Sequence, residues 1–264
     1  MMGTKSKFLV ALSIVVLVGL IFWAFVLQAL PDKSTIWNYL FNSGIGISYL
    51  TAGIAGIVLG GKLKAQPKIS KALLFMGMGV SSYGIGWIIW TFYNIFLKVE
   101  IPVPSVADIF FILLFIPLAA YGLGQVISYL SQTIESKHIL IGLAVFFASF
   151  LVIFGFIMTP EISADLTTIQ NITNSAYPMS DSILLALSLT VAMAGIGKKN
   201  SGFMVLAAAF LLQVVADIFY SYRVASGLYW NGDIADALYS LPAFLLTISF
   251  IKIYSKEAFS LESK

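Results

Sequence analysis

The chain has 264 residues, of which 59% are hydrophobic and 10% are charged, and its formal net charge is +3. Soluble domains carry about 25% charged residues, so this composition and a mean hydropathy of +0.96 exclude a soluble globular protein and predict an integral membrane protein. The absence of cysteine and the single histidine, His138, exclude disulfides, thiolate metal sites and a multi-histidine metal site within the chain.

Eight stretches are long and apolar enough to cross a bilayer as helices, because a spanning helix needs roughly 20 residues. They are residues 8–29, 37–60, 71–97, 106–130, 138–158, 179–197, 202–223 and 233–254. The first follows two lysines, as a signal peptide would, but its apolar run exceeds the roughly 7–15 residues of such a signal. We therefore expect an uncleaved helix and one all-α membrane domain over residues 1–264, with about eight transmembrane helices.

The basic residues are distributed unevenly between the two sides of this predicted bundle. One side holds Lys5, Lys7, Lys62, Lys64, Lys68, Lys71, Lys137, Lys198, Lys199, Lys252, Lys256 and Lys264, and the other side holds Lys33, Lys98 and Arg223. The positive-inside rule then places both termini in the cytoplasm of a multi-pass protein of the cell membrane. The longest outer loop, residues 159–177, contains a glycosylation sequon at Asn171, a tripeptide that is also common by chance.

Small residues form one face of the second span. They are Gly44, Gly46, Ala52, Gly53, Ala55, Gly56, Gly60 and Gly61. Such a face lets two helices approach closely. It predicts tight packing either within the bundle or against another membrane protein.

Three aspartates, Asp108, Asp181 and Asp236, stand at the predicted starts of the fourth, sixth and eighth spans, each after a turn-forming stretch. Proline and serine suit the first positions of a helix. A carboxylate there meets the positive end of the helix dipole, which is worth about 0.3–1 kcal/mol. A repeated helix-start signal explains these acids, and a shared site at the outer rim is the alternative.

Aromatic residues recur at helical spacing where the third and seventh spans end. The third span ends in WIIWTFYN, with Trp87, Trp90 and Tyr93 on one face, and the seventh ends in DIFYSYRV, with Asp217, Tyr220 and Arg223 on one face. The hairpins formed by spans 3–4 and 7–8 therefore look like parallel copies of one unit, with 5–6 a diverged third. An interfacial belt of Trp and Tyr is the alternative explanation of the aromatic residues.

Asp217 lies well inside the seventh span, with Gln213 one turn before it. A charge at the centre of a spanning helix costs about 2.5–3.5 kcal/mol, so such a residue usually faces the bundle interior or a watery cavity. A hydrogen-bonded structural acid and a ligand site are both consistent with this position. Arg223 is too far along the helix to pair with Asp217, and we expect it to pair with Asp233 or Asp236.

These motifs resemble the multi-span membrane region found ahead of GGDEF and EAL signalling domains, and of some histidine kinases, in bacteria and archaea. The matching stretches are Pro104-Ser105-Val106-Ala107-Asp108 with Pro117, Tyr177-Pro178-Met179-Ser180-Asp181, Ala216-Asp217-Ile218-Phe219-Tyr220 and Asp236-Ala237-Leu238-Tyr239. The resemblance covers about residues 40 to 254, and it departs at Trp87 and Asn94, where the family often has acids. It implies a sensory membrane region, here expected to stand alone because no output domain follows residue 254.

Three functions remain open. The first is a sensory module whose outward-facing pocket of aromatic and acidic residues binds a cation, an amine or a lipid headgroup. Its expected ligand-binding residues are Trp87, Trp90, Tyr93, Asp108, Asp181, Asp217, Tyr220 and Asp236. The others are an accessory subunit of a larger membrane complex and a cation- or proton-coupled transporter.

An enzyme has the least support. The chain has no nucleophile elbow, metal cluster or phosphate loop, and it shows no matching pair of buried acids of the kind an intramembrane aspartyl protease needs. The lysines follow the charge rule of membranes, so the expected partners are the lipid bilayer and a membrane protein or complex rather than nucleic acid. The sequence identifies neither a cofactor nor a metal.

Overall fold

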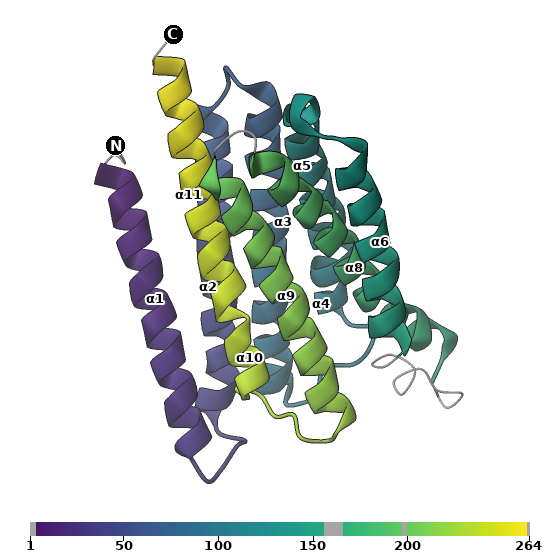
Figure 1. Cartoon of the computed structure of the whole chain (residues 1–264). Coiled ribbons are helices and arrows are strands. Elements are labelled where there is room, and N and C mark those ends of the chain that lie inside the picture. Colours follow the sequence, from purple (N-terminus) through teal and green to yellow (C-terminus); the bar gives the residue numbers. More distant parts are fainter. Residues whose placement is uncertain (1–3, 156–165, 197–199, 263–264) are drawn as a thin grey trace.

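A computed structural model describes residues 4–155, 166–196 and 200–262, and these residues contain helices and no strand. Eight of its helical segments are long and apolar enough to cross a membrane, so the protein is an all-α polytopic membrane protein, as the composition predicts. The segments lie side by side in one bundle (Figure 1). The expected span ends at residues 158 and 197, and Lys198, Lys199 and Lys264, lie outside the described residues.

The first three spans are α1 (Thr4–Ala29), α2 (Ile36–Lys62), and α3 (Pro67–Phe92) continued by the π-helix η1 (Tyr93–Leu97). The fourth combines α4 (Val106–Asp108), the π-helix η2 (Ile109–Leu114) and α5 (Phe115–Tyr129), and the short 3-10 helix η3 (Ser131–Thr133) follows it. The remaining spans are α6 (Ser136–Ile153), α8 (Thr168–Ile196), α9 (Ser201–Ala225), and α10 (Ile234–Leu238) followed by α11 (Ser240–Glu262).

The sixth span begins earlier than the sequence predicts. Helix α8 starts at Thr168 instead of residue 179, and it continues through Pro178. Proline in a helix interior removes one backbone hydrogen bond and usually ends or kinks the helix, which is why the sequence favours a start at this point. Here the Ser182 hydroxyl donates to the Pro178 carbonyl at 2.8 Å. Because α8 already begins at Thr168, Asp181 lies well inside a spanning helix and not in its first turn.

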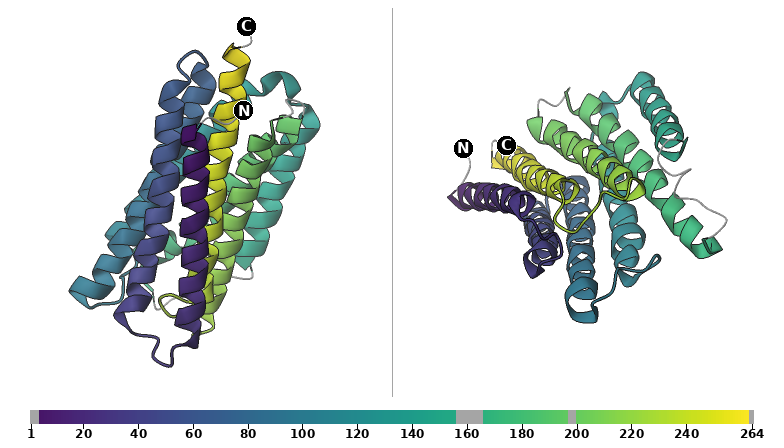
Figure 2. Two further views of the ribbon diagram at one scale, coloured as in Figure 1. Left: turned by 90° about the vertical axis from the view of Figure 1, so that its left-hand side faces the viewer. Right: turned by 90° about the horizontal axis from the view of Figure 1, so that it is seen from below.

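Helices α1 and α6 lie at opposite edges of the bundle (Figure 2). Both are mostly exposed, and the side chains of Phe22 and Phe25 on α1 are each 70% exposed, as expected for surfaces that face lipid. Helices α3 and α11 are the most enclosed, and α2 and α8 follow equally. Helices α2, α3 and α11 supply large, fully buried core side chains, among them Phe41, Tyr49 and Phe250.

Helices α2 and α3 pack through facing glycines. A Cβ atom on Gly53 would lie 2.6 Å from the carbonyl oxygen of Gly77, and one on Gly84 would lie 2.6 Å from the carbonyl oxygen of Gly46. Both positions are closer than van der Waals contact allows, so only glycine permits this approach of the two backbones. Of the two explanations of the small-residue face, packing inside the bundle is therefore the one observed.

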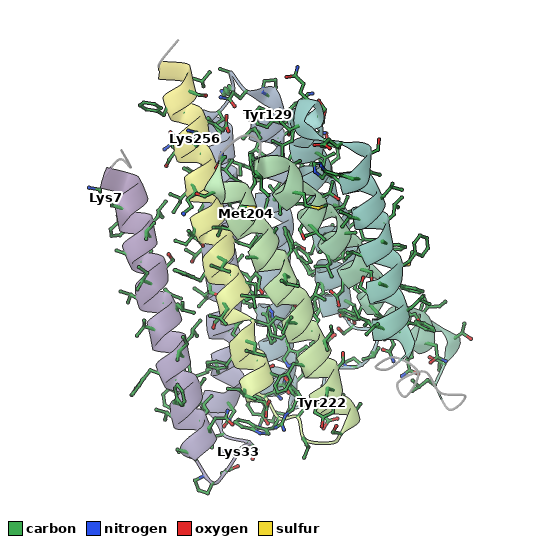
Figure 3. The ribbon with its side chains drawn as sticks, viewed as in Figure 1. Lys7, Lys33, Tyr129, Met204, Tyr222 and Lys256 are labelled. Carbon is green, nitrogen blue, oxygen red and sulfur yellow. The ribbon has the colours of Figure 1, made fainter. Side chains whose placement is uncertain are left out.

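Both ends of the described chain lie at the same end of the bundle (Figure 1). Lys7 and Lys256 lie at this end, whereas Lys33 and Tyr222 lie at the opposite end (Figure 3). The elements also place Lys62, Lys64, Lys68, Lys71, Lys137 and Lys252 toward the end with the termini, and Lys98 and Arg223 toward the other. The described residues thus carry the charge asymmetry on which the orientation prediction rests.

Candidate functional site

A cavity of about 760 Å³ opens at the end of the bundle opposite the termini. Its volume falls within the range of roughly 300–1,000 Å³ typical of small-molecule sites. Its wall comes from α2, α3, η1, α4, η2, α6, α8, α9 and the loops at residues 30–35, 98–105 and 226–233. Segments far apart in the sequence therefore meet around one space.

Most of the residues proposed from the sequence lie in this wall. The wall includes Trp87, Trp90, Asp108, Asp181, Asp217 and Tyr220. Two others lie elsewhere: Tyr93 begins η1 and is half-buried outside the wall, and Asp236 is fully buried behind the wall.

Asp108 combines a helix cap with a contact across the cavity. Its carboxylate accepts hydrogen bonds from the backbone N–H of Ser105 at 2.5 Å and from the Ser105 hydroxyl at 2.9 Å. This is the capping arrangement that a helix start favours, and it explains why an acid stands three residues after Ser105. The hydroxyl of Tyr177 on α8 also donates to Asp108. Asp108 thereby connects α4 to α8.

Asp217 lies at the deep end of the cavity and accepts several hydrogen bonds. The Tyr239 hydroxyl donates to it at 2.7 Å and the Gln213 side-chain amide at 3.0 Å, and the same amide donates to the Tyr83 hydroxyl at 2.8 Å. Gln213 is held in turn by Tyr49, whose hydroxyl donates to the Gln213 side-chain oxygen. This network provides the partners that an acid inside a spanning helix requires.

The carboxyl group of Asp181 lies within hydrogen-bonding distance of the carboxyl group of Asp217. The sequence predicts no matching pair of buried acids, whereas the structure brings together two acids of spanning helices, Asp181 buried and Asp217 half-buried. They meet because α8 begins at Thr168, which moves Asp181 from the predicted helix start to the depth of Asp217. If residues 168–177 are taken as helix despite their polar side chains, the sequence places Asp181 at this depth.

Aromatic rings form much of the cavity wall. They belong to Tyr39, Tyr83, Trp87, Trp90, Phe111, Tyr177, Tyr220, Tyr229, Trp230 and Tyr239. The rings of Trp87 and Tyr239 meet edge to face at 5.1 Å, and those of Trp90 and Tyr220 at 6.2 Å. Sequence reasoning missed Tyr83, although it precedes Trp87 by one turn on the same helix face.

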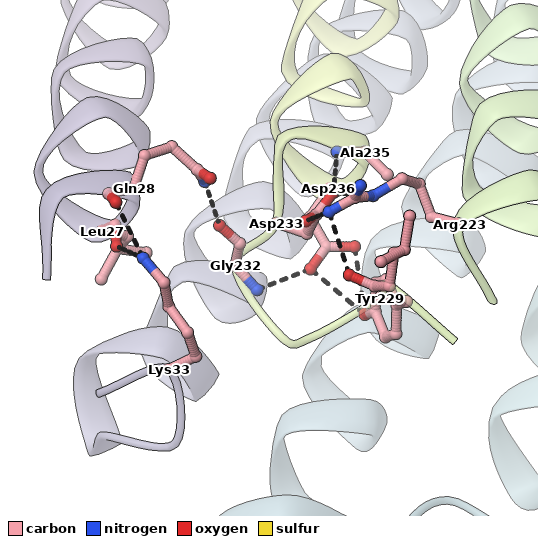
Figure 4. A network of polar contacts seen from close by, with 10 residues as sticks. Leu27, Gln28, Lys33, Arg223, Tyr229, Gly232, Asp233, Ala235 and Asp236 are labelled. Carbon is pink, nitrogen blue, oxygen red and sulfur yellow. Dashed lines mark hydrogen bonds and ion pairs between the residues drawn. The ribbon is translucent and has the colours of Figure 1, made fainter. Parts of the chain in front are cut away.

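Polar contacts hold the loops at the mouth of the cavity (Figure 4). Arg223 donates to both carboxylate oxygens of Asp233, at 3.2 Å and 2.5 Å, which confirms one of its two expected pairings. Asp233 also caps α10 by accepting from the Ala235 N–H at 2.9 Å. Lys33 donates to the carbonyls of Leu27 and Gln28 at 2.9 Å and 2.8 Å.

Asp236 stabilises the loop behind this mouth. It accepts hydrogen bonds from the Gly232 N–H at 2.7 Å and from the Tyr229 hydroxyl at 3.2 Å. Burial, together with the nearby Asp236 carboxylate, raises the pKa of Tyr229 well above its usual value, so the phenol remains a neutral donor. These contacts describe a structural residue that closes the 226–233 loop.

The wall carries more negative than positive groups. Among the described residues, its acids are Asp32, Glu100, Asp108, Asp181 and Asp217, and its one base is Lys33. The Lys33 ammonium also lies 4.6 Å from the ring centre of Trp230, so Lys33 is already engaged. Within residues 4–155, 166–196 and 200–262, no group of three or more His, Asp or Glu side chains is close enough to hold a metal ion.

The two remaining sequence features lie away from the deep part of the cavity. His138, in the first turn of α6, accepts a hydrogen bond from the backbone N–H of Glu135 at 3.2 Å through Nδ1. Asn171 of the sequon lies in the first turn of α8, whereas the sequence places it in a loop. Glycosylation of Asn171 stays a prediction.

Comparisons with protein-family models, with curated proteins and with solved structures found no match. The resemblance to membrane regions of signalling proteins therefore stays a prediction.

Proposed function

We propose that the protein is a membrane-embedded sensory module that binds a small organic cation in the cavity between α3, α8 and α9. One observation supports this most strongly: an aromatic wall carries five acids and one lysine, and that lysine is already bound to backbone carbonyls. Aromatic faces attract cations with about 0.5–2 kcal/mol each, and quaternary ammonium groups are recognised this way.

An organic cation suits this cavity better than a metal ion does. Metal ions take several oxygen ligands at about 2.0–2.6 Å, and the described acids do not gather in threes. The acids are instead spread around a space of about 760 Å³ among aromatic rings. Such a space accommodates a molecule with an apolar surface and a positive charge.

The orientation and the output are part of the same proposal. The excess of lysine at the end with the termini supports a cytoplasmic location of that end, so the cavity opens to the outer side. The resemblance to sensory membrane regions supports a role in signalling, and a partner protein in the membrane would carry the signal onward.

A binding measurement tests the proposed function directly. Purified protein is titrated with choline and with its neutral isostere 3,3-dimethyl-1-butanol, and binding is followed by calorimetry and thermal unfolding. We expect choline to bind at least tenfold more tightly, a difference of about 1.4 kcal/mol. Asp217→Asn should weaken choline binding about tenfold or more. Glu135→Gln, in an exposed ion pair at the other end, should not change it. Equal affinity for the two compounds would exclude a cation site.

A coupled transporter is the second candidate. The observation that favours it is the Asp181–Asp217 contact within two spanning helices, because intramembrane acids often line ion pathways. Uptake of labelled choline into liposomes distinguishes the two functions. Uptake that Asp217→Asn abolishes would identify a carrier, whereas binding without uptake would leave the sensory module. One argument for an accessory subunit is lost, because the small-residue face of α2 packs against α3 inside the bundle.

A further inference from the structure

We propose that Asp181 and Asp217 share one proton when no cation is bound, and that a cation entering the cavity displaces this proton. The inference rests on the proposed function and specifies its regulation: cation binding is an exchange that consumes one cation and releases one proton. Its basis is the contact between the two carboxyl groups at the deep end of the cavity.

The contact itself requires a proton. An ionised carboxylate only accepts hydrogen bonds, so two carboxyl groups can be hydrogen-bonded to each other only when one of them is protonated. Two carboxylates in contact would also repel each other strongly where water is scarce. Asp181 is 7% exposed and Asp217 is half-buried, so solvent screens only part of this repulsion.

The surrounding donors indicate which residue carries the proton. Asp217 accepts from the Tyr239 hydroxyl and the Gln213 amide, and donors around a carboxylate favour its ionised form. We therefore place the proton on Asp181, whose O–H donates to Asp217. Gln213 lies on α9 and Tyr239 immediately before α11, so the packing of these helices favours the ionised form of Asp217.

The other ionisable groups near the pair do not neutralise it. Tyr83 on α3, Tyr177 on α8, Tyr220 on α9 and Tyr239 before α11 are phenols, and Asp108 across the cavity is a further acid. Lys33 in the described wall is engaged with backbone carbonyls and Arg223 at the rim with Asp233, and Lys98 at the same end of the bundle does not line the cavity. Among the residues that the structure describes, the pair therefore has no built-in counter-ion, and a bound cation can take that role.

The exchange balances in charge and atoms. Before binding, the pair holds one proton and one negative charge. After binding, it holds two negative charges and the cation, so the total charge of the site is unchanged. The O–H bond of Asp181 breaks, and the proton leaves through the cavity to water. A quaternary ammonium ion carries no ionisable proton, so any proton released must come from the protein.

Infrared spectroscopy tests the shared proton without any ligand. A protonated carboxylic acid has a carbonyl band distinct from that of a carboxylate. We expect wild-type protein near neutral pH to show a band that Asp181→Asn removes and Asp217→Asn shifts. Glu257→Gln is the matched control, because Glu257 is a buried acid at the other end that accepts from the Tyr129 hydroxyl at 2.8 Å. Absence of a band that depends on Asp181 would overturn the proposal.

Titration with choline in weakly buffered solution tests the exchange. We expect about one proton released per bound choline, and an apparent affinity that falls about tenfold for each pH unit of acidification. Asp181→Asn should bind choline more weakly, with no proton release and no such pH dependence, because an amide can donate to Asp217 but cannot ionise. Glu135→Gln should behave as wild type.

The two proposals fail in different ways. Choline binding without proton release would overturn the exchange and leave the proposed function intact. An Asp181-dependent band without binding of choline, or of tetramethylammonium as a second probe, would overturn the proposed function and support the shared proton alone.

Discussion

Asp108, Asp217 and Asp236 carry the same side chain, and their neighbours give them different roles. Asp108 caps a helix and accepts from Tyr177 across the cavity. Asp236 accepts from the Gly232 N–H and closes a loop. Asp217 lies deepest among phenols and a second carboxyl group. The sequence already places Asp217 deeper in its span than the other two acids. Only the contacts distinguish an acid with a structural role from an acid that faces the cavity.

The Arg223–Asp233 ion pair is the clearest test at this scale. Asp233 is fully buried, so Arg223→Met would leave a buried charge unpaired, a change that costs about 3–5 kcal/mol of folding free energy. We expect a clear loss of thermal stability in detergent. The double variant Arg223→Met/Asp233→Asn should recover part of the loss, because asparagine also caps helices.

The exposed Lys137–Glu135 ion pair provides the control. Its side chains are 64% and 63% exposed, and exposed pairs contribute little because water screens them. Lys137→Met should leave the unfolding temperature unchanged. If Arg223→Met and Lys137→Met lowered the unfolding temperature equally, burial would not explain the contribution of the Arg223–Asp233 pair to stability.

At the scale of elements, the packing of α2 on α3 positions the cavity wall. The facing glycines bring α3 close to α2, and α3 supplies Tyr83, Trp87 and Trp90 to the wall. Helix α8 has a comparable effect through its early start, since it carries Tyr177 and Asp181 to the cavity. The loops before α4 and α10 also resemble each other: in both, a capping residue is followed three positions later by an acid, Asp108 or Asp236.

Gly53→Ala tests the close approach of α2 and α3. The added methyl group would lie 2.5 Å from the Ser81 nitrogen and 2.6 Å from the Gly77 oxygen. Because both contacts are with backbone atoms, the helices must separate, and overpacking of this kind costs about 1–3 kcal/mol. We expect a lower unfolding temperature and weaker choline binding.

Gly61→Ala is the matched substitution on the same helix. A Cβ atom there has nothing within 4 Å, and alanine favours helix by about 0.5–1 kcal/mol relative to glycine. We expect unchanged or slightly higher stability. A destabilised Gly61→Ala, or an unaffected Gly53→Ala, would contradict the packing argument.

At the scale of the whole molecule, one end of the bundle is basic and the other holds an aromatic and acidic cavity. Most of the described lysines lie at the end opposite the polar wall, and Lys33 and Lys98 lie at the cavity end. The positive-inside rule relates such an asymmetry to orientation. The proposed function depends on this relation, since a sensor of external cations must open its cavity to the outside.

Labelling of single cysteines tests the orientation, and the chain contains no native cysteine. Ser226 follows α9 at the cavity end, Ser131 lies in η3 at the other end, and both are exposed. In intact cells, a membrane-impermeant maleimide should label Ser226→Cys and should label Ser131→Cys only after permeabilisation. The reverse pattern would place the cavity in the cytoplasm.

The sequence by itself determined the number of spanning helices, the distribution of charge between the two ends, and the helix faces that carry Trp87, Trp90 and Tyr220. These follow from the hydropathy and spacing of nearby residues, which a chain retains whatever its tertiary packing. The capping role of Asp108 is equally local, because Ser105 is only three positions away.

Only the tertiary structure decided that Asp181 meets Asp217, that Asp236 is buried outside the cavity wall, and that Tyr83 and Tyr239 face the same space. Contact between residues of different helices depends on the depth and rotation of each helix in the bundle. A single shift, the start of α8 at Thr168, moves Asp181 deep into the bundle. Hydropathy does not detect this shift, because the polar residues before Pro178 can form either a loop or the first turns of a helix.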